Sequence, residues 1–341
     1  MDRQHKLKVI FIPKLIFGVS LLLLSLTGLI LDAKDNEESS QEDKPVASPT
    51  PAAEASSEST ESALEDAKAE MEIGRNMAGK LLAFYGVVND KPLVSYLNQV
   101  GNYVAKAGSY PDRKYMFAIL DSDSVNAFAC PGGYILVTKG TIRHAQNEAE
   151  IAAVLGHEAA HVGLQHMYKS LKSMSADEAK KLQTEAEGRK LNDPYAMARR
   201  RPTPDESAAG GALAKFLMSA SGAGLSVLQA AKAGMNVMLE KGLDQKLEFE
   251  ADGEGVKYAI NAGYDPKGLD KFLARLALEK KKSSDKTVMD KTHPTIPDRR
   301  KAIAEVLNKM SADEITGAVL QKRFQGFQKR IAKKSVKKAG K

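Results

Sequence analysis

The pentapeptide HEAAH at residues 157–161 constrains this chain more than any other feature of its sequence. Residues four positions apart on a helix share a face, so the imidazoles of His157 and His161 can point at one metal ion. With only six histidines in the chain, random placement gives about 0.007 copies of a His-Glu-x-x-His pattern. Apolar neighbours predict a core helix over 147–167 with Asn147 as its N-cap, and a solvated helix face is the alternative.

The residue types in this motif suit a zinc site that activates water. Neutral imidazoles bind zinc, zinc lowers the pKa of a bound water, and the Glu158 carboxylate can take that proton and pass it to a leaving amine. A catalytic zinc has three protein ligands and one open position. His166 follows His161 by five residues, which is about 140° further round a helix. We therefore interpret His166 as a flanking residue rather than as the third ligand.

A second acidic motif offers the third ligand. The segment LEFEAD at 247–252 places Glu248 and Asp252 four residues apart, on one face of a predicted helix. Glu248 can bind the metal, and Asp252 can accept a hydrogen bond from a ligand imidazole, as the outer partners of metal-binding histidines do. An amphipathic helix with outward carboxylates is the alternative. The presence of the metal-binding pattern at 157–161 in the same chain makes this alternative less favoured.

The segment GYILVT at 133–138 predicts a strand before the zinc-site helix. We expect it to be an edge strand over the metal, where an extended peptide can pair with the main chain. This hypothesis makes Gly133, Tyr134, Ile135 and Leu136 candidate substrate-binding residues. An ordinary internal strand is the alternative.

The remaining patterns predict a predominantly helical α+β fold. Only 116–121 and 133–138 have the character of strands. Helical spacing of apolar residues covers 62–85, 94–107, 147–167, 212–240, 243–262, 266–281 and 298–309.

Four segments together resemble the gluzincin metallopeptidase family of the HtpX heat-shock protease, the BepA periplasmic protease and the CAAX prenyl proteases. The resemblance covers about residues 65–308, and its motifs are specific as a set. The segments are NAFACPGGYILVTKG at 126–140, NEAEIAAVLGHEAAHVGLQH at 147–166, LEFEADGEGVKYAINAGYDP at 247–266 and THPTIPDR at 292–299.

The resemblance implies a zincin-like domain whose small sheet has an edge strand beside the active site. It also implies one zinc ion per chain and a set of site residues. The ligands would be His157, His161 and Glu248, the catalytic base Glu158, and the ligand-orienting residue Asp252, with His293 and Arg299 near the site. The sequence has neither the multiple transmembrane helices of the HtpX and prenyl-protease branches nor the helical repeats of BepA-like proteins. We therefore expect the soluble envelope branch.

His293 is a further candidate catalytic residue. Pro294 follows it and disfavours helical backbone at His293, and Pro297 and Asp298 begin the next predicted helix. We therefore expect His293 on a short, stiff loop beside the zinc. It could donate a hydrogen bond to the oxyanion formed when water attacks the peptide carbonyl, or it could occupy the open position on zinc and keep the site latent. A surface-loop histidine is the alternative to both roles.

Composition divides the chain into four parts. Basic residues precede an uncharged apolar run near the N-terminus, which predicts a signal peptide or an N-terminal membrane anchor. A stretch rich in acidic residues, Ser, Pro and Ala predicts a disordered linker. The predicted parts are 1–33 for the signal or anchor, 34–62 for the linker, 63–310 for the metalloprotease domain with a mobile insertion at 168–211, and 311–341 for a basic C-terminal helix or tail.

These features favour an exported zinc-dependent endopeptidase, in the periplasm or on the outer face of the inner membrane. Its expected partners are unfolded or misfolded envelope polypeptides, which it would hydrolyse in protein quality control. The alternative is a latent protease that acts mainly as a chaperone-like binding module for such polypeptides. The N-terminus and the basic tail could touch an acidic membrane surface. No nucleic-acid partner is expected, because no recognised nucleic-acid fold is present.

Overall fold

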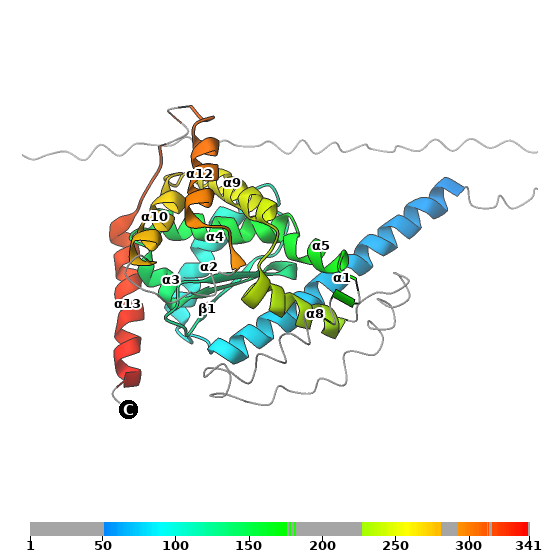
Figure 1. The fold of residues 1–341 in the computed structure, drawn as a ribbon, viewed down its shortest axis with the longest axis horizontal. Helices are drawn as coiled ribbons and strands as arrows, with labels where there is room; N and C mark the ends of the chain where they lie inside the picture. Colours follow the sequence, from blue (N-terminus) through cyan, green and yellow to red (C-terminus); the bar gives the residue numbers. More distant parts are fainter. Residues whose placement is uncertain are drawn as a thin grey trace, which may run out of the picture. The chain divides into compact units, whose positions relative to one another are not determined.

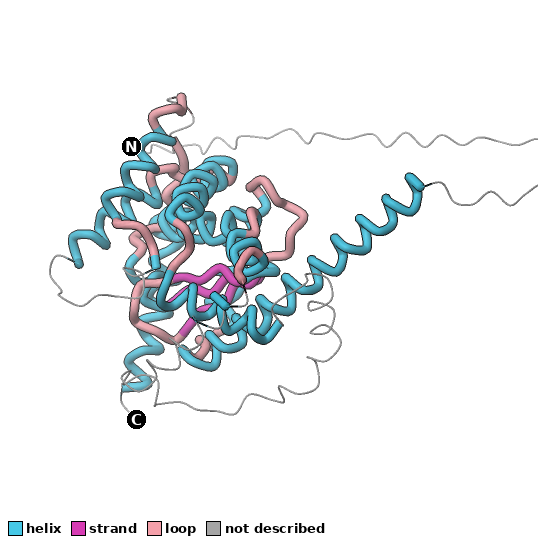
Figure 2. Tube along the Cα trace, turned by 45° about the vertical axis from the view of Figure 1, so that its right-hand side comes forward, coloured by secondary structure: helices cyan, strands magenta, loops and turns pink. Residues whose placement is uncertain are grey.

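The computed structural model describes residues 51–175, 177–178, 181, 227–280, 292–311, 313 and 316–339. Within these residues helices predominate around one three-stranded sheet (Figure 1 and Figure 2), which confirms the predicted α+β fold. The helices are α1 (Pro51–Tyr85), α2 (Lys91–Lys106), α3 (Lys139–His144), α4 (Glu148–Gly163), α5 (His166–Lys172), α8 (Val227–Asn236), α9 (Gln245–Asn261), α10 (Gly268–Lys280), α12 (Ile296–Leu307) and α13 (Gln321–Ala339). The strands are β1 (Met116–Leu120), β2 (Ala127–Cys130) and β3 (Tyr134–Thr138), with a 3-10 turn η1 (Pro131–Gly133) and a π-helical turn η2 (Val237–Lys241).

The strand β3 lies in the centre of the sheet, whose order is β1-β3-β2. β1 pairs with β3 in parallel, and β2 pairs with it antiparallel, with Ala127 opposite Val137. The prediction that 133–138 is an edge strand is therefore wrong. The four-residue strand β2 is too short to stand out in the sequence pattern, and η1 folds it back onto β3. Gly133 in this turn has a φ of 99°, which glycine adopts without strain.

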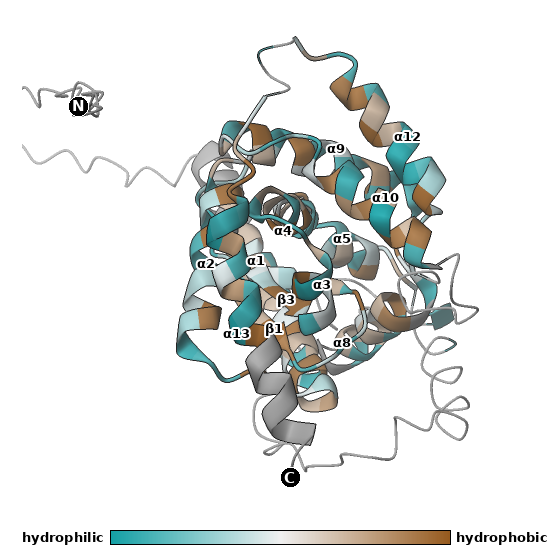
Figure 3. Ribbon diagram, turned by 90° about the vertical axis from the view of Figure 1, so that its left-hand side faces the viewer, coloured by the Kyte–Doolittle hydropathy of each residue, from teal (hydrophilic) through white to brown (hydrophobic). Residues whose placement is uncertain are grey.

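The helix α4 runs through the core, and all of its residues from Glu148 to Gly163 are buried. It lies between the sheet on one side and α9, α10 and α12 on the other (Figure 1 and Figure 3). As predicted, Asn147 is its N-cap, because the Asn147 side chain accepts a hydrogen bond from the Glu150 amide at 3.0 Å. A helix with buried residues on every face must satisfy any polar side chain within the protein.

The helices α4 and α9 cross at close range, because each has a glycine at the crossing. A Cβ atom on Gly255 would lie 2.7 Å from the backbone nitrogen of His157, and one on Gly156 would lie 3.0 Å from the Gly255 carbonyl oxygen. Any larger residue at Gly255 would push the two helices apart. The close crossing brings Glu248 and Asp252 of α9 against the polar residues of α4.

Two helices extend into segments that the sequence analysis assigned to the linker and to the insertion. α1 begins at Pro51, inside the predicted linker 34–62, because its Ala and Glu residues favour helix and proline is tolerated in a first turn. α5 begins at His166 and continues to Lys172, so its last five residues fall within the predicted insertion 168–211, where Tyr168 and Leu171 are buried.

Of these two segments, residues 34–50, 176, 179–180 and 182–211 lie outside the described residues, as does the predicted signal or anchor at 1–33. In the part of the chain that the structure describes, no helix is both long and apolar enough to cross a membrane.

The helix α13 packs against the core through residues 321–331, the part of it whose side chains the structure describes. Its Phe324, Phe327 and Ile331 side chains are buried, and the Arg323 guanidinium binds the buried Glu148 carboxylate at the start of α4. The segment 311–341, predicted as a basic C-terminal helix or tail after a domain ending at 310, thus contributes buried side chains to the core. Its apolar residues share one helix face, a pattern that the many lysines of the segment obscure.

Candidate metal centre

Three parts of the chain meet in one cluster of polar side chains. Each was predicted from the sequence as a site residue, and the structure brings them together. α4 contributes His157, Glu158 and His161, α9 contributes Glu248 and Asp252, and the segment that ends in α12 contributes His293 and Arg299. All are buried except His293, which is half-buried.

The donor atoms of three of these residues have the spacing of metal ligands. His157 Nε2 lies 3.2 Å from His161 Nε2. Glu248 Oε1 lies 3.5 Å from His161 Nε2, and Glu248 Oε2 lies 3.7 Å from His157 Nε2. Ligands bound to zinc in a tetrahedron at about 2.1 Å are about 3.4 Å from one another. The three side chains therefore fit around a single ion.

The carboxylate of Glu248 provides a second test of this fit. Its Oε2 atom is buried and has no hydrogen-bond partner among the described residues, and burial raises the pKa of Glu248 to about 7. A buried carboxylate oxygen without a partner is costly. A cation at the point where the imidazoles converge would remove that cost, so the residues present fit a metal.

His293 approaches the same point. Its Nε2 lies 3.5 Å from Glu248 Oε2, and ligand atoms of His293, Glu248 and His157 all lie within 4.8 Å of one another. Thr292 Oγ1 lies 3.0 Å from His293 Nδ1 and so holds the ring with Nε2 towards the site. His293 thus has the position of a fourth ligand beside the three that the sequence predicts.

A buried ion pair fixes the imidazole of His157. Its Nδ1 lies 2.9 Å from Asp252 Oδ1, and Arg299 binds both oxygens of Asp252, at 2.6 and 2.9 Å. Burial by itself would raise the pKa of Asp252, but Arg299 and His157 hold it well below its usual range. Asp252 is therefore ionised and accepts the Nδ1 proton of His157, which leaves the Nε2 lone pair for a metal.

The protonation of the neighbouring groups suits a metal site with a general base. Burial lowers the pKa of His161 well below its ordinary value, and the nearby imidazoles lower it further. This imidazole is therefore neutral, as a ligand must be. Burial raises the pKa of Glu158 above its ordinary value, towards the range in which a carboxyl group can both accept and return a proton.

A small cavity beside the cluster shows which strand borders the site. Its volume is about 30 Å³, and Glu158, His157 and His293 line it together with Asn126 and Ala127, at the start of β2. The predicted substrate residues are not among those that line it: Gly133, Ile135 and Leu136 are buried and Tyr134 is half-buried, in η1 and the central strand. The edge strand beside the site is therefore β2, and the assignment of β3 is wrong.

His166 is a site residue whose role the sequence did not reveal. Its Nδ1 lies 2.9 Å from His161 Nδ1, and its Nε2 lies 3.2 Å from Glu250 Oε2. The helical projection placed His166 away from His161 because it assumed an unbroken helix. α4 instead ends at Gly163, and Gln165 takes a left-handed conformation with a φ of 60° that turns the chain into α5.

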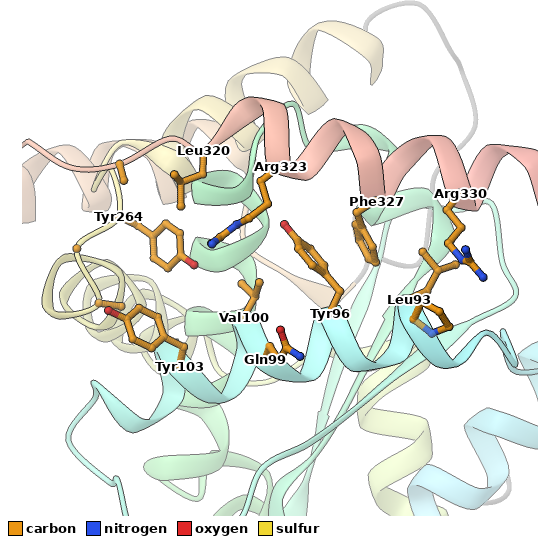
Figure 4. Close-up of a pocket in the computed structure, with 14 residues that line it drawn as sticks. Leu93, Tyr96, Gln99, Val100, Tyr103, Tyr264, Leu320, Arg323, Phe327 and Arg330 are labelled. Carbon is orange, nitrogen blue, oxygen red and sulfur yellow. The ribbon is translucent and has the colours of Figure 1, made fainter. Parts of the chain in front are cut away.

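A larger groove lies apart from this cluster, between α2, the turn after α9, and α13. Its volume is about 830 Å³. Figure 4 shows Tyr96, Tyr103 and Tyr264 along its wall, with Arg323 and Arg330 reaching in from α13. These arginines are bound to Glu148 and Asp90 respectively. None of the predicted catalytic residues lines this groove, so it is not the candidate metal centre.

Comparison with known proteins agrees with this geometry. A relative in Escherichia coli (strain K12), named beta-barrel assembly-enhancing protease, is 26% identical over 237 residues, which are 69% of this chain and 43% of the relative. A protein of the same name in Yersinia pestis is 27% identical over 231 residues, or 68% of this chain and 42% of the relative. The mitochondrial metalloendopeptidase OMA1 of Arabidopsis thaliana is 28% identical over 149 residues, or 44% of this chain and 23% of the relative.

The chain thus spans less than half the length of these relatives. The sequence model of one family, described as peptidase family M48, matches residues 94–307. This match includes α4, α9 and the whole of α12, and it covers more than half of the chain. The resemblance inferred from the motifs is therefore confirmed, and the chain belongs to peptidase family M48.

Proposed function

We propose that this chain is a zinc-dependent endopeptidase that hydrolyses peptide bonds in unfolded or misfolded polypeptides of the cell envelope. The observation that carries the proposal is the convergence of His157 Nε2, His161 Nε2 and both Glu248 oxygens within 3.2–3.7 Å, beside the buried carboxyl group of Glu158. Membership of peptidase family M48 and the relatives named as proteases and metalloendopeptidases support it.

Each residue of the cluster has a distinct task in this proposal. Zinc, when bound, would lower the pKa of a water molecule and polarise the peptide carbonyl. Glu158 accepts the proton of the attacking water and returns it to the leaving amine, for which its raised pKa is suited. Asp252 and Arg299 hold His157 in one orientation, so that no reorganisation is needed during turnover.

The surroundings of the cluster suggest how a substrate would bind. Among the described residues β2 has a strand on one side only, so an extended peptide can add to it through main-chain hydrogen bonds. The small cavity next to Glu158 is lined by the apolar side chains of Val154, Phe272 and Leu273. We therefore propose backbone-directed binding with a preference for a small apolar side chain next to the cleaved bond.

One observation favours the alternative of a latent protease that mainly binds unfolded polypeptides. His293 Nε2 lies 3.5 Å from Glu248 Oε2, which is the separation of two ligands on one ion. If His293 occupies the fourth position, water and substrate are excluded from it. Hydrolysis would then require displacement of His293, and binding could occur without cleavage.

The cell envelope is the proposed location. The two relatives named beta-barrel assembly-enhancing proteases support it, together with the predicted signal or anchor at 1–33. The side chains of Lys322 and Lys329 on α13 are exposed. They would provide the proposed contact with an acidic membrane surface.

The first prediction concerns metal content. Purified protein should hold one zinc ion per chain, and His157→Ala, His161→Ala and Glu248→Ala should each lose it, because each removes a donor atom. Glu158→Gln should retain the zinc, since Glu158 is not a ligand. Elemental analysis after gel filtration measures the ratio. Full zinc content in Glu248→Ala would contradict the assigned ligand set.

The second prediction concerns activity. The protein should digest casein, a chelator should stop digestion, and added zinc should restore it. Glu158→Gln should be slower by about 10²–10⁴-fold, the usual contribution of a general base. A thermal melt establishes that this variant is folded. Digestion that survives both the chelator and the Glu158→Gln change would rule out the proposed chemistry.

The third prediction separates the two roles of His293. If His293 blocks the fourth position, His293→Ala should cleave a fluorogenic unstructured peptide several-fold faster, in proportion to the blocked fraction. If it stabilises the oxyanion, the same change should slow cleavage by about 10²–10³-fold at unchanged zinc content. The distance to Glu248 favours the first result. Wild-type rate and wild-type zinc content together would mean that neither role is correct.

The fourth prediction concerns location. In spheroplasts of a bacterium that expresses the full chain, added protease should digest the folded domain, because the domain is proposed to lie outside the cytoplasm. A cytoplasmic marker protein should stay intact in the same sample. Protection of the domain until the cells are lysed would refute the proposed orientation.

A further inference from the structure

We propose that His166 is a positioning residue that, together with Glu250, selects the metal-binding tautomer of His161. The inference rests on the proposed function, because it concerns how one ligand of the proposed zinc is held. Its basis is a chain of side chains that leads outward from the metal centre. His161 Nδ1 lies 2.9 Å from His166 Nδ1, and His166 Nε2 lies 3.2 Å from Glu250 Oε2.

The directions of these hydrogen bonds follow from counting protons. A neutral imidazole has one N–H donor and one acceptor nitrogen, and a carboxylate only accepts. If His161 presents its Nε2 lone pair to a metal, its proton is on Nδ1, and it must donate to His166 Nδ1. His166 then has its own proton on Nε2 and donates it to Glu250. Every donor in this arrangement has one acceptor.

The reverse arrangement, in which the neutral His166 ring donates to the neutral His161 ring, is unfavourable for both residues. If His166 donated from Nδ1, His161 would have its proton on Nε2, where it would block metal binding. The unprotonated Nε2 of His166 would then face the Glu250 carboxylate at 3.2 Å, with two acceptors in contact and no proton between them. Glu250 therefore favours the tautomer of His166 that accepts from His161, and this in turn favours the ligand tautomer of His161.

The fold holds His166 in this place. α4 ends at Gly163, and Gln165 has a left-handed backbone conformation. This turn of the chain places His166 beside His161. Gln165 Nε2 donates to Glu70 Oε2 of α1 at 2.6 Å, which secures the turn. His166 itself is 3% exposed. The turn at Gln165 and the burial of the ring therefore hold His166 against His161.

The two ligand histidines have outer partners of different kinds. His157 donates directly to Asp252, a carboxylate that is buried and bound by Arg299. His161 instead contacts His166, which in turn contacts the carboxylate of Glu250. The Glu250 side chain is 51% exposed. Solvent weakens the influence of such a half-exposed charge. We therefore expect loss of His166 to matter more than loss of the Glu250 charge.

A simpler explanation of His166 is a buried histidine that contributes only to stability, and the chain offers a matched control for it. His144 is also buried, its Nε2 lies 3.2 Å from the Phe272 carbonyl oxygen, and its Nδ1 lies 3.0 Å from Glu279, whose side chain is 57% exposed. The partners of His144 do not include any of the proposed ligands. Substitution of His144 should therefore affect stability alone.

The test measures zinc affinity by competition with a chelator, on the full chain. His166→Phe removes both ring nitrogens and should weaken zinc binding about 10–100-fold, the usual effect of losing an outer partner of a ligand. His166→Asn can place an acceptor oxygen near the former Nδ1, so it should restore most of the affinity. Glu250→Gln should weaken binding less than His166→Phe. His144→Phe should lower the melting temperature of the metal-free protein and leave zinc affinity unchanged.

A second measurement reads the tautomers directly. Ring-nitrogen NMR of the zinc-loaded protein should show His161 protonated on Nδ1 and His166 protonated on Nε2. This readout needs no variant, so it remains decisive if His166→Phe does not fold. His166 protonated on Nδ1 would overturn the proposal.

Unchanged zinc affinity in folded His166→Phe would also overturn it, as would an equal loss of affinity in His144→Phe. These results differ from a failure of the proposed function, in which the wild-type protein itself would bind no zinc.

Discussion

The close crossing of α4 and α9 is the constraint on which the rest of the site depends. Gly255 approaches the backbone of His157 so closely that a Cβ atom would lie 2.7 Å from its nitrogen. Glycine inside a helix costs about 1 kcal/mol of stability relative to alanine, and the close approach at Gly255 carries that cost. The approach brings Glu248 and Asp252 within reach of the two imidazoles from a second helix. A wider crossing would leave the histidines without a carboxylate partner.

The cluster formed at this crossing has more acidic side chains than permanently charged basic ones. Three buried carboxyl groups, Glu158, Glu248 and Asp252, lie near one buried guanidinium, that of Arg299. Arg299 is already bound to both oxygens of Asp252. Burial of further carboxylates is unfavourable unless a cation pairs them, which explains why burial raises the pKa of Glu158 and Glu248. The protein therefore preorganises a site whose charge a divalent metal ion would balance, and metal binding should stabilise the fold.

Periodic patterns in the sequence were enough to predict the two pairs of residues at the centre of this site. The neighbours of these residues depend on tertiary contacts, which such patterns do not contain. Residues four apart on one helix face identified both His157 with His161 and Glu248 with Asp252, because that geometry is local. The sequence placed His166 outside the ligand set, but its contact with His161 could not be predicted, because no propensity rule forecasts a left-handed residue such as Gln165 at the end of α4. The edge strand was misassigned because β2 has only four residues, and such a short run has no clear period.

The start of α4 also depends on a segment outside the region that matches the family. A helix begins with four backbone N–H groups that have no partner within it. In α4, the amide of Glu150 donates to the side chain of the N-cap Asn147, and the amide of Ile151 makes the first regular helical hydrogen bond, to the Asn147 carbonyl. The amides of Glu148 and Ala149 donate instead to the carbonyl of Val319, at 3.1 and 3.3 Å, and α13 supplies the arginine that pairs with the Glu148 carboxylate. The family match ends at residue 307. The first turn of the helix that carries the metal-binding histidines is therefore completed by the segment after the shared domain, so this segment is part of the structure that holds the site.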